Sequence, residues 1–94
     1  MELVFVRSRT LLPAEVEKAC SLLNLQVTMK GSLKSLSDNV HWHYKLAKQP
    51  GVLEVTLTLN ENKLILTCKK NRSGEWLAGA IEELKRALKL EEIA

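Results

Sequence analysis

The chain has 94 residues, of which 46% are hydrophobic and 27% charged, and its formal net charge is +3 at pH 7. This length allows one hydrophobic core and the composition excludes a disordered chain, so we expect a single domain over residues 1–94. No apolar run approaches the roughly 18 residues that span a bilayer, and the first residues lack a signal-peptide pattern, which predicts a cytoplasmic protein with no membrane attachment.

A short strand is predicted over residues 2–7, which are rich in strand-forming side chains. A helix is predicted from Pro13, because the first helical turn tolerates a residue without an amide hydrogen. Glu15 and Glu17 follow where the helix dipole favours negative charge. The apolar stripe expected on this helix comprises Leu12, Val16, Ala19, Cys20 and Leu23.

From Leu25 to Cys68 the apolar residues alternate with polar ones, which predicts a series of strands. Turn-forming residues at 35–39, 48–51 and 60–62 separate them. Because a slip of one residue would expose the whole apolar set, only certain registers are compatible with the pattern. The pairs expected at the three hairpins are Leu33 with Val40, Leu46 with Leu53, and Leu59 with Leu64.

This alternation predicts a sheet with one apolar and one open face. Trp42 and Tyr44 belong to the apolar face, under the helices, while His41 and His43 belong to the open, polar face. The rows expected across the open face are Thr28, Lys45, Glu54 and Lys69; Lys30, His43, Thr56 and Thr67; and Ser32, His41, Thr58 and Ile65.

A final helix is predicted from Ser73, whose hydroxyl is suited to cap the first turn. Gly79 is expected either to admit another backbone or to be merely tolerated within this helix. The element order βαββββα predicts a two-layer α+β domain: one mainly antiparallel sheet of four to five strands with two helices packed on one face. The first strand has two alternative places, beside the second strand or beside the last.

Cys20 and Cys68 both fall at apolar positions, which indicates small buried side chains in a reducing compartment. His41 and His43 are separated by one residue, so both imidazoles point to the same side of a strand, as in metal-binding His-x-His pairs. Zinc needs a third ligand. The expected neighbours are Thr, Ser and Lys, and Glu54 is expected one row away in an ion pair, so the sequence predicts neither a metal site nor a cofactor.

A catalytic alternative would use His43 as a general base. No nucleophile elbow, paired catalytic carboxylates or glycine-rich phosphate loop accompanies it. The sequence therefore favours a protein that is not an enzyme.

A second alternative is binding to the phosphate backbone of a nucleic acid, because residues 26–72 have an excess of five positive charges. A helix, strands and a second helix preceded by the basic residues 69–72 resemble the topology of double-stranded RNA-binding domains. The chain departs from them in the acidic and apolar residues 73–77 and in two additional strands. The candidate binding residues are His41, His43, Lys30, Lys45, Lys69, Lys70 and Arg72.

The interpretation that the sequence favours is a small, non-catalytic binding or protein-interaction module. Its partner would be a second copy or another protein. The strand at residues 25–33 offers a route if it lies at a sheet edge, because an edge strand has unpaired backbone groups that another chain can extend.

Overall fold

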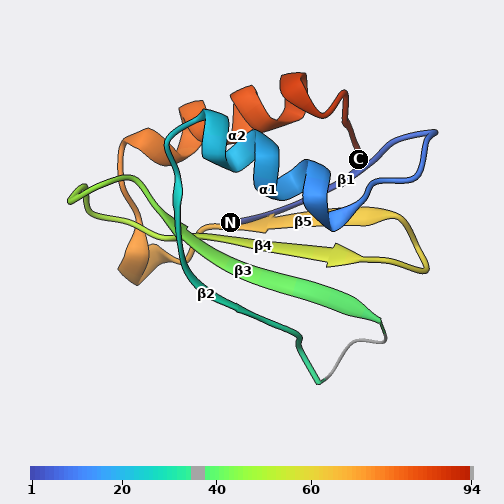
Figure 1. The fold of residues 1–94 in the computed structure, drawn as a ribbon. Helices are drawn as coiled ribbons and strands as arrows, with labels where there is room; N and C mark the ends of the chain where they lie inside the picture. Colours follow the sequence, from blue (N-terminus) through green and yellow to red (C-terminus); the bar gives the residue numbers. More distant parts are fainter. Residues whose placement is uncertain (35–37, 94) are drawn as a thin grey trace.

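Two helices lie on one face of a six-stranded antiparallel sheet in the computed structural model, which describes residues 1–34 and 38–93. Figure 1 shows both α-helices above the sheet. The predicted α+β class and the placement of both helices on one face are confirmed. The turn expected at residues 35–39 lies partly outside the described residues.

The sheet has the spatial order β2-β3-β4-β5-β1-β6, and every neighbouring pair is antiparallel. β1 therefore lies beside β5, one of the two places that the sequence allowed, and β2 is an edge strand. The sequence did not predict β6, a pair of residues with no pattern of their own. The strands are β1 (Glu2–Val6), β2 (Gln26–Gly31), β3 (Asn39–Lys45), β4 (Leu53–Thr58), β5 (Lys63–Thr67) and β6 (Glu91–Glu92).

Helix α1 (Pro13–Leu22) begins at proline, as predicted, and buries Val16, Ala19 and Cys20. Leu12 was expected on the apolar stripe but is 54% exposed, whereas its neighbour Leu11 is buried in the core. Leu12 is the extended N-cap residue, so the helical spacing does not yet apply to it.

Helix α2 (Trp76–Ala87) begins three residues later than predicted, after a short 3-10 turn, η1 (Lys70–Arg72). Ser73 does not cap it, because its hydroxyl donates a hydrogen bond to the carbonyl of Lys70 at 3.3 Å. The apolar side of the helix nevertheless packs on the sheet, burying Leu77, Ile81 and Leu84. Among the described residues, neither helix is long and apolar enough to cross a membrane.

The predicted registers at two hairpins are wrong by two residues. Leu53 pairs with Tyr44 instead of Leu46, and Leu64 pairs with Leu57 instead of Leu59. A shift of two residues keeps every side chain on its own face of the sheet. The division between faces is therefore preserved, and Trp42 is completely buried beneath the helices.

A β-bulge between Val27 and Met29 breaks the alternation predicted for β2. Beyond it, Met29 lies opposite His43, and Lys30 lies opposite Trp42. The expected position of Lys30 on the open face is wrong for this reason. Its ammonium instead lies 2.7 Å from the Glu17 carboxylate of α1, on the helix side of the sheet.

The same bulge overturns the pairing expected at the first hairpin. Gly31 lies opposite His41 and not opposite Trp42. Instead of continuing the ladder to Val40, Leu33 exchanges two hydrogen bonds with the side-chain amide of Asn39, at 2.8 and 2.9 Å. Gly31, which has no side chain, is therefore the β2 partner of His41.

Both cysteines are buried and unpaired, as the sequence predicts. Desolvation by burial raises the pKa of the Cys20 thiol to about 12, so the unreactive thiol form dominates at neutral pH. Burial also raises the pKa of Cys68. Neither cysteine contributes to the cluster described next.

Candidate metal centre

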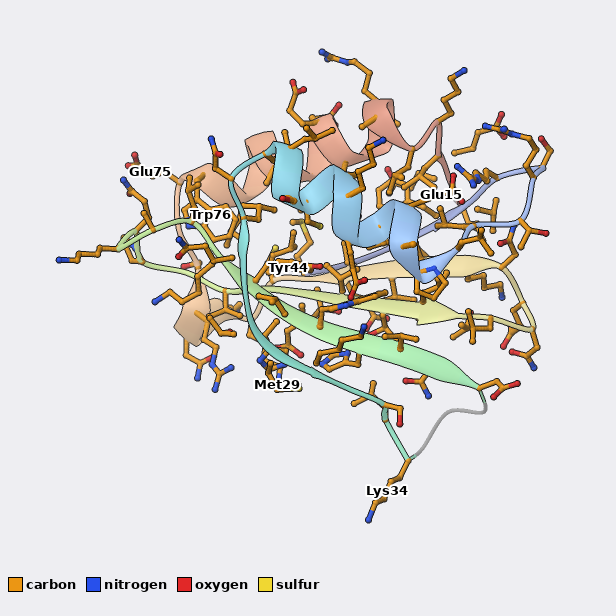
Figure 2. All side chains as sticks on the ribbon, viewed as in Figure 1. Glu15, Met29, Lys34, Tyr44, Glu75 and Trp76 are labelled. Carbon is orange, nitrogen blue, oxygen red and sulfur yellow. The ribbon has the colours of Figure 1, made fainter. Side chains whose placement is uncertain are left out.

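The outer face of the sheet, opposite the helices, brings together three side chains from the neighbouring strands β3 and β4. In Figure 2, Tyr44 lies between the sheet and the helices, whereas Met29 lies on the opposite side of the sheet. His41 and His43 alternate with Tyr44 along β3 and therefore share the outer side with Met29. Glu54 lies directly opposite His43 on β4.

The ligand atoms of these three residues, here called the His-His-Glu cluster, converge on one point. The Nε2 atoms of His41 and His43 are 3.1 Å apart. Glu54 Oε1 lies 3.6 Å from each of these two nitrogens. In a tetrahedral site with bonds of about 2.1 Å, ligand atoms are separated by about 3.4 Å, so the three distances fit one zinc ion.

Thr56 orients the first histidine of the cluster. Its hydroxyl lies 2.7 Å from His41 Nδ1, and Thr56 stands opposite His41 on β4. When Nδ1 carries the proton and donates to this oxygen, the lone pair of the ring is on Nε2, which faces the other two ligands. Metal-bound histidines characteristically use their second nitrogen in this way.

The two histidines, both expected on the open face, differ in burial. His41 is only 5% exposed and Glu54 only 7%, whereas His43 is half-buried. Desolvation by burial lowers the pKa of His41, the neighbouring His43 lowers it further, and Glu54 opposes both effects. His41 is therefore neutral at neutral pH, in the state that binds a metal.

Glu54 is the member of the cluster whose burial lowers the stability of the fold. Its Oε2 atom is buried and has no hydrogen-bond partner among the described residues. The ammonium of Lys69 lies 3.4 Å from this oxygen, within ion-pair distance but not aligned as a hydrogen bond. A buried carboxylate oxygen without a hydrogen bond costs about 1–3 kcal/mol, and the ion pair with the half-exposed Lys69 offsets only part of this cost.

The interpretation of this cluster as a metal site rests on its geometry alone. No protein-family model, curated protein or solved structure matches this chain.

The structure divides the candidate binding residues of the sequence into three groups. His41, His43 and Lys69 meet at the cluster, and Lys45 follows His43 on the same side of β3. Lys30 is on the opposite face. The remaining two residues, Lys70 and Arg72, are exposed in the η1 turn.

Glu54 is the functional candidate that sequence reasoning missed. It was expected one row from His43, paired with two lysines, because the hairpin register was wrong by two residues. One signal was present: Glu54 is the only charged residue in the β4 segment Leu53–Thr58, which is buried throughout. A buried carboxylate needs a polar or charged partner, and His41 and His43 on the neighbouring strand β3 offer two imidazoles.

Proposed function

We propose that this protein is a small binding module whose ligand is a zinc ion, held by His41, His43 and Glu54. The observation that supports this most strongly is the convergence of three ligand atoms at distances of 3.1, 3.6 and 3.6 Å. A second support is the buried Oε2 atom of Glu54, which has an ion pair with Lys69 but no hydrogen bond among the described residues, because a cation in the cluster would further compensate its negative charge.

The ligand types favour zinc over the other common ions. Two imidazoles and one carboxylate form a known zinc ligand set, whereas Ca²⁺ and Mg²⁺ prefer oxygen ligands alone. An octahedral iron site with bonds of about 2.1 Å would hold neighbouring ligands about 3.0 Å apart, and two of the three distances here are longer.

The arrangement gives less support to nucleic-acid binding. Of the basic residues proposed for that role, Lys30 is paired with Glu17 on the helix side and Lys69 is paired with Glu54. A phosphate-binding surface needs cations that are free to converge on one face. Lys45, Lys70 and Arg72 remain available, but they contribute a weaker basic surface than the sequence predicted.

A zinc titration of the purified protein without a histidine tag tests the proposal. We expect one zinc ion per chain with a Kd of about 1 µM or lower, measured by competition with a chromogenic chelator. His43→Ala should weaken binding at least about a hundredfold, because changing even a residue that only hydrogen-bonds to a metal ligand costs about 10–100-fold.

Ser32→Ala serves as the matched control, because Ser32 is exposed just beyond the end of β2 and supplies no ligand to the cluster. It should bind zinc as the unaltered protein does. Lowering the pH should weaken binding, because protons compete with zinc for the ligand nitrogens, and the lowered pKa of His41 should move its part of this loss to a lower pH than for an ordinary imidazole. Equal zinc binding by the unaltered and His43→Ala proteins would refute the proposal.

A further inference from the structure

The cluster supplies three ligands, and a tetrahedral zinc ion takes four. Among the described residues, the group that could hold an ion consists of His41, His43 and Glu54. Structural zinc sites are closed by a fourth protein ligand, whereas sites with three protein ligands leave one position for a molecule from solution. An ion bound here would therefore have one open position.

One ammonium group lies beside the cluster, and a second lysine follows on the same face of the sheet. The ammonium of Lys69, whose side chain is 55% exposed, lies 3.4 Å from Glu54 Oε2. Lys45 lies two residues beyond His43 on the same side of β3, opposite Gln26 in the register of the edge strand β2. A zinc ion bound by one carboxylate has a net charge of +1, and the ammonium of Lys69 adds a second positive charge. If the fourth zinc ligand were a neutral water molecule, both charges would remain uncompensated.

We propose that the open position binds an oxyanion, the carboxylate or phosphate group of a small molecule, between the metal ion and the ammonium of Lys69. This inference rests on the proposed zinc site. The metal would coordinate one oxygen of the anion, and Lys69 would donate a charge-assisted hydrogen bond to another. Lys69 is then a binding residue for the anion, and its contact with Glu54 keeps the ammonium beside the site.

Lys69 should affect the two binding steps in opposite directions. A positive charge beside the ligands repels a metal ion but attracts an anion. Lys69→Gln should therefore bind the metal more tightly than the unaltered protein, and the loaded variant should bind the anion about tenfold more weakly. A variant that was merely misfolded would lose both affinities, so the opposite signs identify the role of the charge.

Cobalt(II) is a suitable probe, because its visible absorption reports the number and type of ligands. Cobalt-loaded protein would be titrated with acetate in one series and with methyl phosphate in another. We expect a saturable spectral change with at least one of them, and the series that responds identifies the class of anion. Lys85→Gln, on α2 across the sheet, is the matched control and should change neither affinity.

The outcomes separate the two proposals. Cobalt binding without any response to either anion would overturn the oxyanion site and leave the metal centre standing. Equal anion affinity in the loaded unaltered and Lys69→Gln proteins would overturn the role of Lys69. Failure to bind cobalt or zinc would remove the metal centre, and the oxyanion site with it.

Discussion

The Glu54→Gln protein is expected to bind zinc at least about a hundredfold more weakly, yet to unfold no more easily than the unaltered protein when both are free of metal. Glutamine fills the same volume but replaces the charged ligand by a neutral amide. It also removes a buried charge whose Oε2 atom has no hydrogen-bond partner in the described part of the chain. The lost ion pair with the half-exposed Lys69 is worth little, so the metal-free variant should gain up to about 2 kcal/mol.

Chelator competition and denaturant unfolding in the presence of EDTA measure these two effects. Glu61→Gln is the matched control, because Glu61 is exposed and pairs with Lys63 at 3.0 Å, away from the cluster. It should leave both quantities unchanged. Loss of stability in metal-free Glu54→Gln would contradict the account, because it would make Glu54 a structural residue that the fold requires.

Two glycines five residues apart are expected to respond to alanine with opposite signs. A Cβ atom at Gly74 would lie 2.0 Å from the carbonyl oxygen of Pro50, a backbone atom in the loop between β3 and β4. That oxygen also accepts a 2.7 Å hydrogen bond from the indole of Trp76. Gly74→Ala must therefore push the loop away from α2, at a cost of about 1–3 kcal/mol or more.

Gly79 lies within α2, and a Cβ atom there would meet no atom of residues 1–34 and 38–93 within 4 Å. Of the two roles that the sequence allowed, Gly79 is therefore tolerated and not needed for a close approach. Gly79→Ala should stabilise the protein by up to about 1 kcal/mol, since alanine is the better helix former. Urea unfolding of both variants measures the two changes, and destabilisation of similar size in both would show that the contact at Gly74 is not specific.

The arrangement of layers was predictable from the sequence because it depends on periodicity alone. Helical spacing and strand alternation assigned Val16, Trp42 and Leu66 to one core, and all three are fully or almost fully buried. These assignments survive a register error of two residues, since such a shift leaves each side chain on its face. The order of the elements and the position of both helices follow from the same signal.

The register itself depends on contacts that are distant in sequence. The loop after β3 is longer than predicted, because Gly51 has a φ of 110° and packs against Gly74 before α2. The turn before β5 is held by Asn62, whose side-chain amide donates hydrogen bonds to the carbonyls of Arg7 and Arg9 at 3.0 and 2.9 Å. Local turn propensities do not contain this information.

The sequence predicted the two histidines of the candidate site but not its carboxylate, because only the carboxylate depends on the register. The spacing of His41 and His43 placed both imidazoles on the open face, but the third ligand depends on the register. With the pairing observed, Glu54 moves from the neighbouring row to the position opposite His43. Nothing in the local sequence of β2 signals its bulge, which moved Lys30 to the helix side of the sheet.

The most direct test of the metal centre is a crystal structure of the zinc-loaded protein, with diffraction measured on both sides of the zinc absorption edge. We expect one strong anomalous peak about 2.0–2.2 Å from His41 Nε2, His43 Nε2 and a carboxylate oxygen of Glu54. A peak bound only elsewhere on the chain, or no peak from protein crystallised with excess zinc, would contradict the account.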